Sequence, residues 1–297
     1  MHSRIASGLA MVAIAAASWG TWSVFLRPTG LPATATAPLM FLVMGLVALP
    51  FAAREPRVPW DRRSLALLLM YAAFDALNVL TFFAALSETT VAIAVLTHYL
   101  APILIALAAP FVDRIETPGA RPAAAVALAG LVIVLEPWRA PAEGAVLGAT
   151  LGALSALCYC GNVFTVRRLA TRVGPSRAMA YHSLIAAIAL APLLLGQTAE
   201  ITAGDVALVS LGSTLLGAGG GILFATGLTR IGSARTAVLT FAEPVVAVAV
   251  GALVWHEPLR PLAVIGGALV LGAGIHVARS SAHHDELAPR DDRDARV

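Results

Sequence analysis

Long runs of apolar residues alternate along this sequence with short clusters of Arg and Pro. A helix of about 20 apolar residues crosses the hydrocarbon core of a bilayer, so uncharged runs near this length predict transmembrane helices. The short connections leave no room for a soluble domain. Ten spans are predicted: Ile5–Leu26, Thr34–Phe51, Ser64–Leu86, Thr90–Val112, Arg121–Leu135, Gly144–Val166, Arg177–Leu195, Ala203–Leu228, Arg235–Trp255 and Leu262–Val277.

The arginines predict how these spans are oriented. If the N-terminus is cytoplasmic, 17 of the 20 arginines fall on the cytoplasmic side, and only Arg27, Arg139 and Arg260 fall on the other. Cytoplasmic loops carry an excess of basic residues, so this split predicts both termini in the cytoplasm of a bacterium, with the chain in its inner membrane. The first apolar run is too long for a cleaved signal peptide, so we expect it to stay as a span.

Composition narrows the possible functions. The chain is 59% hydrophobic and 12% charged, as expected of an all-α integral membrane protein. A net charge of +3, with no Lys, argues against nucleic acid as a partner and against an ATP-binding loop of its own. Cys158 and Cys160 are interpreted as packing residues. No metal or cofactor is expected, and the segment 281–297 is predicted to be a disordered cytoplasmic tail.

The sequence contains an internal repeat. The run Ala94–Thr97, followed by Pro102, reappears as Ala237–Thr240, followed by Pro244. This predicts two five-helix halves, 1–140 and 141–280. Because five is odd, tandem halves enter the membrane in opposite orientations, and such inverted repeats suit alternating access around a central site.

Each of these prolines leads to an acidic turn, which ends in Glu116 in one half and Glu257 in the other. Together with the 5+5 layout, these stretches resemble the drug/metabolite transporter superfamily in its ten-helix EamA-type branch, particularly the YddG-like amino-acid exporters, over about residues 5–278. The resemblance implies a basket of helices around a central cavity, with the fifth and tenth helices outside it. It also favours export.

One helical stripe of the third span carries most of the polar chemistry. Tyr71, Asp75, Asn78 and Phe82 follow one another at helical spacing, so they share a face. An ionisable residue in hydrocarbon is costly unless it faces a cavity or a partner. The stripe therefore suits a zwitterionic or aromatic ligand in the cavity, and the alternative is that Asp75 only joins two helices.

Both repeated prolines have functional candidates beside them. Pro102 removes a backbone hydrogen bond near His98 and Tyr99, which predicts a freed carbonyl able to accept from a substrate ammonium. The alternative is a packed kink. In the second half, Glu243 precedes Pro244. We interpret Glu243, Pro102 and Pro244 as coupling or gating residues, and the alternative for Glu243 is a helix contact.

Further binding candidates lie on other spans. Trp19 is placed to stack on a ligand, unless it is an interfacial anchor. Asn162 belongs to a polar stripe of the sixth span, and Tyr181 with His182 lies in the seventh. Gly219 and Gly220 belong to a glycine-rich run that predicts a bend or gating hinge in the eighth span.

These residues favour a secondary transporter for amino acids or similar small metabolites, working as a monomer in contact with lipid. A multidrug exporter of organic cations is the alternative, and a channel is less favoured. A sugar-phosphate carrier would need arginines within the spans. The sequence also lacks the motifs of intramembrane enzymes, so no enzymatic activity is expected.

Overall fold

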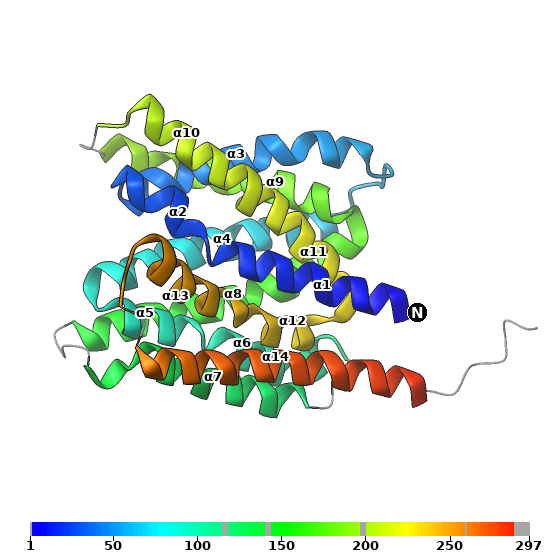
Figure 1. Cartoon of the computed structure of the whole chain (residues 1–297). Helices are drawn as coiled ribbons and strands as arrows, with labels where there is room; N and C mark the ends of the chain where they lie inside the picture. Colours follow the sequence, from blue (N-terminus) through cyan, green and yellow to red (C-terminus); the bar gives the residue numbers. More distant parts are fainter. Residues whose placement is uncertain are drawn as a thin grey trace, which may run out of the picture.

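The computed structural model describes residues 2–114, 117, 119–139, 144–196, 200–258 and 260–287. In this part of the chain all regular elements are helices and no strand occurs (Figure 1), which confirms the all-α prediction. The elements are α1 (His2–Trp19), α2 (Trp22–Leu26), η1 (Arg27–Thr29), α3 (Ala33–Arg54), α4 (Arg62–Glu88), α5 (Val91–His98), α6 (Ala101–Val112), α7 (Ala120–Leu135), η2 (Pro137–Arg139), α8 (Ala145–Val173), α9 (Pro175–Leu190), η3 (Ala191–Gly196), α10 (Ala203–Gly212), η4 (Ser213–Gly219), α11 (Gly220–Ile231), α12 (Ser233–Thr240), α13 (Ala242–Val254) and α14 (Pro261–Leu287).

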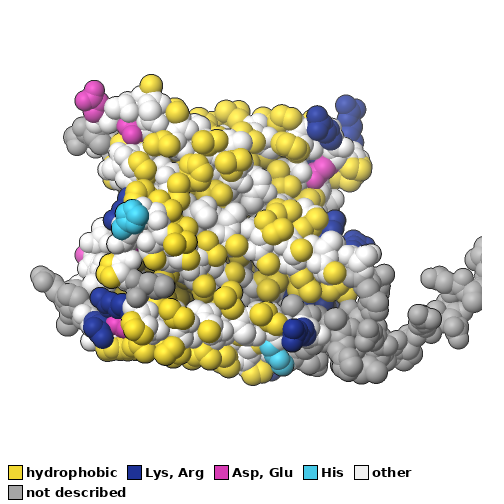
Figure 2. All heavy atoms as spheres, viewed as in Figure 1, with side chains coloured by type: hydrophobic (Ala, Val, Ile, Leu, Met, Phe, Trp, Pro, Cys, Tyr) yellow, Lys and Arg dark blue, Asp and Glu magenta, His cyan; other side chains and the backbone are white. Residues whose placement is uncertain are grey.

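Nine helical stretches within the described residues are long and apolar enough to cross a membrane, and they overlap the first nine predicted spans. A shorter apolar helix covers Pro261–Val277. Large apolar side chains point outward, among them Phe111 at 80% exposure and Ile188 at 75%. Figure 2 shows hydrophobic side chains over the middle of this face and most charged side chains near its two ends. This surface suits a multi-pass membrane protein.

Four of the predicted spans are interrupted rather than continuous. The first divides into α1 and α2, the fourth into α5 and α6, and the ninth into α12 and α13. In the eighth, the π-helical segment η4 separates α10 from α11. Pro102 and Pro244 lie in the first turns of α6 and α13, where a missing amide hydrogen costs little. Each proline thus begins a new helical segment instead of bending a continuous one.

The helices pack in pairs that join the two halves of the chain. The most extensive contacts are those of α4 with α8, α3 with α9, α7 with α14, and α1 with α11. In Figure 1, α7 and α14 run together along one side of the bundle, and α3 and α9 lie on the opposite side. Small residues allow the close approach of α7 to α14. A Cβ atom on Gly130 would lie only 2.7 Å from the Gly266 carbonyl oxygen.

Reciprocal capping fixes α9 against α3. The buried guanidinium of Arg177 donates to the carbonyls of Ala52 and Glu55 at the end of α3. In return, the Glu55 carboxylate accepts from the amides of Ser176 and Arg177 at the start of α9, at 2.8 and 3.0 Å. Each charge lies at the helix end whose dipole it complements. This arrangement positions the side chains that α9 directs toward the centre of the bundle.

The start of α1 and the end of α14 lie at the same end of the bundle (Figure 1). Helix α14 continues through Leu287, so its backbone is helical over the first part of the segment predicted as a disordered tail. The rest of that tail, 288–297, lies outside the described residues, as does Glu116 of the first acidic turn.

Candidate functional site

A cavity of about 510 Å³ lies among the helices of both halves. This volume is within the range of small-molecule sites. Aromatic and Met side chains form much of its wall, and a few polar groups converge within it. Its described lining residues come from α1, α2, α3, α4, α5, α6, α8, α9, α11, α12 and α13, with contributions from η1, η4 and the turn after α13, and none of them belongs to α7 or α14.

The cavity reaches the surface at one end of the bundle. There Arg27 Nη1 donates to Glu257 Oε1 at 2.7 Å, and both side chains are about half exposed, at 53% and 54%. The Arg27 guanidinium also lies over the Trp255 ring, 4.8 Å from its centroid. All three residues belong to the lining, so they form the mouth of the cavity. A partly exposed ion pair of this kind is weak enough to open.

A second, mostly buried ion pair joins the two halves at the end of α6, and neither of its residues belongs to the cavity lining. Arg167 on α8 lies 2.8 Å from Asp113 at the end of α6, and their side chains are 18% and 2% exposed. The backbone amide of Ser233 donates to the other oxygen of Asp113 at 3.3 Å. Arg168 donates to the Val112 carbonyl at 2.8 Å. These contacts tie the second half to the end of α6.

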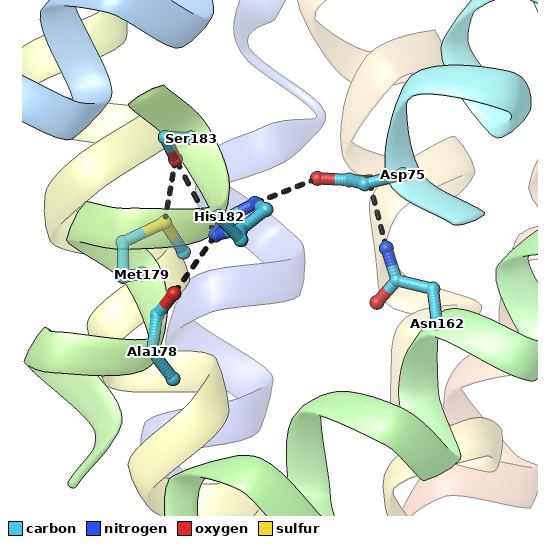
Figure 3. A network of polar contacts seen from close by, with 6 residues as sticks. All are labelled: Asp75, Asn162, Ala178, Met179, His182 and Ser183. Carbon is cyan, nitrogen blue, oxygen red and sulfur yellow. Dashed lines mark hydrogen bonds and ion pairs between the residues drawn. The ribbon is translucent and has the colours of Figure 1, made fainter. Parts of the chain in front are cut away.

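The predicted stripe of α4 faces the cavity. Tyr71, Asp75, Asn78 and Phe82 all belong to its lining. Both oxygens of Asp75 have partners, as Figure 3 shows. Asn162 donates its amide to Oδ1 at 2.7 Å, and Oδ2 lies 2.9 Å from Nε2 of His182. The carboxyl is therefore held in place, and the Asp75 side chain is 18% exposed.

A second polar network fixes the tautomer of His98. The Ser155 hydroxyl donates to Asn78 Oδ1 at 2.8 Å, and it lies 2.8 Å from His98 Nδ1. A hydroxyl has one proton, so Nδ1 must donate to the Ser155 oxygen. Nε2 of a neutral His98 is then an acceptor, which suits an ammonium donor in the cavity.

The interrupted spans bring further groups to the lining. His98 ends α5, Glu243 lies in the first turn of α13, and both line the cavity together with Tyr99. In η4, the Leu216 carbonyl accepts the Trp19 indole N–H at 2.9 Å. A π-helical segment leaves such a carbonyl without its usual helical partner, and it often occurs at functional sites.

The structure brings most of the predicted site residues together. Those that line the cavity are Trp19, Tyr71, Asp75, Asn78, Phe82, His98, Tyr99, Pro102, Asn162 and Glu243. The others lie outside the lining. His182 is buried directly behind Asp75, and Tyr181, one residue earlier, packs its ring on Trp60 at 5.5 Å. Pro244 is buried in α13, and Gly219 and Gly220 join η4 to α11, where Gly220 lies against the Trp19 ring.

Several lining residues have no signal in the sequence. Tyr159, Met44, Met179 and Thr240 face the cavity because of the rotation of their helices, which depends on packing between helices. Tyr159 lies between two residues of the same type, Cys158 and Cys160, so no periodic pattern distinguishes its face of the helix.

The chain is similar to known membrane transporters. The family model of the EamA-like transporters matches it in two segments, residues 6–135 and 146–278. A protein of Archaeoglobus fulgidus described as an uncharacterized transporter is 30% identical over 282 residues, which are 91% of this chain and 96% of that protein. A protein of known crystal structure has the same fold, with a TM-score of 0.80 and 23% identity over 92% of this chain and 98% of that one.

Proposed function

The chain belongs to the EamA-like transporter family, whose members move small molecules across membranes, and from this premise we propose that it transports amino acids or similar ammonium-bearing metabolites. The observation that carries the proposal is Asp75, a carboxyl that faces an aromatic-lined cavity deep in the bundle. A carboxylate held in this way binds an ammonium group through charge-assisted hydrogen bonds. Transport needs no ATP, and its direction is export.

The rest of the lining fits the remaining parts of an amino acid. His98 Nε2 supplies a second acceptor for the ammonium group, and Asn78 and Tyr159 supply donors for the carboxylate. Trp19 and Phe82 offer faces on which an aromatic or aliphatic side chain packs. The site therefore recognises the charged end of the substrate more strictly than its side chain.

The mechanism is alternating access by two inverted five-helix repeats, with Pro261–Val277 as the tenth span and with both termini cytoplasmic. The two segments matched by the family model support the repeat. On this topology the mouth at Arg27 and Glu257 faces the exterior, and the Asp113–Arg167 pair closes the cytoplasmic end. The structure then corresponds to an outward-open state. One chain holds the whole cavity, which favours a monomer in a bacterial inner membrane.

The test is uptake of radiolabelled L-phenylalanine, L-methionine and L-lysine into proteoliposomes by wild type and by Asp75→Asn. A hydrogen bond to a charged group contributes about 1.5–3 kcal/mol, so the variant is expected to lose about 10- to 150-fold in transport efficiency. Glu200→Gln, which removes an exposed carboxylate, is the matched control. Saturable uptake that survives in Asp75→Asn refutes the assigned site.

Organic cations are the second candidate class of substrate. Among the described lining residues the one arginine is Arg27 at the mouth, and Asp75 and Glu243 lie deeper. Such an acidic and aromatic wall also suits a bulky cation. Tetraphenylphosphonium belongs in the same uptake experiment, because uptake of this cation without any amino acid would favour the drug-exporter alternative.

A further inference from the structure

The mouth of the cavity carries two opposite charges that are held in place but not buried. Arg27 Nη1 donates to Glu257 Oε1 at 2.7 Å, and the two side chains are 53% and 54% exposed. Both residues belong to the cavity lining. Exposed ion pairs contribute little to stability, so a ligand can open this pair at small cost. Any molecule that uses the mouth passes these two charges.

Neighbouring residues fix the position of each charge. The Arg27 guanidinium lies over the Trp255 ring, 4.8 Å from its centroid, and the Trp255 indole N–H donates to the Ser23 hydroxyl at 3.2 Å. The Glu257 amide donates to the Gly251 carbonyl at 3.0 Å. A Cβ atom on Gly251 would lie 2.7 Å from Glu257 Oε2, so the absent side chain leaves room for this carboxylate beside α13. Contacts other than the pair itself therefore position both groups.

Each charge keeps hydrogen-bonding capacity that the pair does not use. A guanidinium has several N–H donors in a planar fork, and within the described residues one of those of Arg27 bonds to Glu257. Glu257 Oε1 accepts that bond, and no described group donates to Oε2. A ligand that carries both a carboxylate and an ammonium group thus finds a donor fork and a charged acceptor side by side.

Arg27 is the one fixed positive charge in the described lining. The sequence has no Lys, and the inner donors available to a substrate carboxylate, Asn78 and Tyr159, are neutral. The inner site at Asp75 therefore offers a charged partner to the ammonium group of a substrate but none to its carboxylate. Recognition of the carboxylate by charge is left to the mouth.

We propose that Arg27 and Glu257 form an outer binding site for zwitterionic amino acids, separate from the inner site at Asp75. The inference rests on the proposed function. The substrate carboxylate bonds to the Arg27 guanidinium and its ammonium group to Glu257, so two ion pairs replace one and no charge is left unpaired. A cation without a carboxylate gains only the contact with Glu257 and is repelled by Arg27. The outer site selects zwitterions, whereas the inner site accepts any ammonium group.

The first experiment measures docking at the mouth without relying on transport. Leu26, a lining residue next to Arg27, is changed to Cys in protein that also carries Cys158→Ala, Cys160→Ala and Asp75→Asn, the last of which weakens the inner site. The rate of labelling by a maleimide is measured in nanodiscs with L-phenylalanine, phenethylamine or hydrocinnamate. These compounds share one aromatic group and carry both charges, the ammonium alone or the carboxylate alone. We expect L-phenylalanine to slow labelling at a concentration about tenfold below that needed by either analogue.

Variants of the pair test whether this protection comes from the outer site. Arg27→Gln is expected to raise the protecting concentration of L-phenylalanine about tenfold, the lower end of the range for a bond to a charged group, because the site is half exposed. Arg260→Gln is the matched control, since Arg260 is 56% exposed and pairs with Glu136 but lies outside the cavity lining. Absence of protection by L-phenylalanine, or protection that survives both Arg27→Gln and Glu257→Gln, overturns the inference.

The second experiment compares the two sites through uptake into proteoliposomes. Asp75→Asn removes the contact with the ammonium group, which L-phenylalanine and phenethylamine share, so it should lower the uptake of both. Arg27→Gln removes only the contact with the carboxylate, so uptake of L-phenylalanine should fall about tenfold relative to that of phenethylamine. If Arg27 only closed the mouth, its replacement would change the uptake of both compounds equally. Such an equal change contradicts the inference.

The outcomes separate this inference from the proposed function. If wild type takes up no amino acid, the proposed function fails, and the labelling experiment still decides whether the mouth binds a zwitterion. If wild type takes up L-phenylalanine and Arg27→Gln leaves its uptake relative to phenethylamine unchanged, the inner site stands and the outer site is wrong.

Discussion

The closed end of the bundle makes the alternating-access proposal testable through Asp113→Asn. The Asp113 side chain is 2% exposed and its partner Arg167 is 18% exposed, at a separation of 2.8 Å. Removing one partner of a fully buried pair costs about 3–5 kcal/mol, and we expect about 2 kcal/mol because Arg167 keeps some contact with water. In the proposed mechanism the pair forms only when this end is closed. The variant should therefore shift the equilibrium away from the observed state by about 30-fold.

The assay compares access to the cavity from its two sides. A single cysteine replaces Met44, a lining residue, in a background in which Cys158 and Cys160 are changed to Ala. A membrane-impermeant maleimide is then added on either side of the membrane. We expect the ratio of the labelling rate on the Arg27 side to that on the Asp113 side to fall about 30-fold in Asp113→Asn.

Asp61→Asn is the matched control at the same end. Asp61 pairs with Arg172 at 2.6 Å, but their side chains are 54% and 35% exposed. Hydrogen bonds from Ser64 hold the pKa of Asp61 below its usual range, so this carboxylate is charged at neutral pH. Exposed ion pairs contribute little to the free-energy difference between states, so the labelling ratio should change by less than about threefold. A ratio that is unchanged in Asp113→Asn, or equally shifted in Asp61→Asn, refutes the reasoning.

Three glycine substitutions give further predictions. Gly220→Ala would place a Cβ atom 2.9 Å from the Trp19 indole nitrogen, so we expect a loss of roughly fivefold or more in uptake, whereas Gly219→Ala, with only a carbonyl at 3.4 Å, should stay close to wild type. Equal uptake by the two variants would contradict this role of Gly220. Gly130→Val would force α7 away from the Gly266 carbonyl and should destabilise the detergent-solubilised protein by about 1–3 kcal/mol, seen as a lower melting temperature. Its apparent Km should not change, because neither helix lines the cavity.

The sequence predicted the spans and the α4 stripe for the same physical reason. Lipid excludes charge from long segments, so the apolar runs mark the helices, and the few polar residues inside them are visible against that background. Helical spacing then places Tyr71, Asp75, Asn78 and Phe82 on one face without any knowledge of the partner helices. All four line the cavity in the structure.

The sequence could not predict which of two adjacent residues on α9, Tyr181 or His182, points toward Asp75. Tyr181 and His182 have similar polarity, and adjacent residues on a helix point about 100° apart. The rotation of α9 is set by its packing on α3 and by the reciprocal capping of Arg177 and Glu55. That rotation directs His182 to Asp75 and leaves the Tyr181 ring on Trp60.

Under the proposed repeat, the two halves are more alike in the course of their backbone than in the side chains at equivalent positions. Both halves interrupt the equivalent span, between α5 and α6 and between α12 and α13. The offset that brings Thr97 onto Thr240 brings Asp75 onto Ala218 and His182 onto Leu39, neither of which carries a titratable group. The Asp75–His182 pair therefore occurs once per chain, although the interrupted span occurs in both halves. The acidic residues of the cavity wall are therefore distributed asymmetrically: Asp75 comes from the first half, and Glu243, the one other acidic residue deep in the described lining, comes from the second half at a position that is not equivalent.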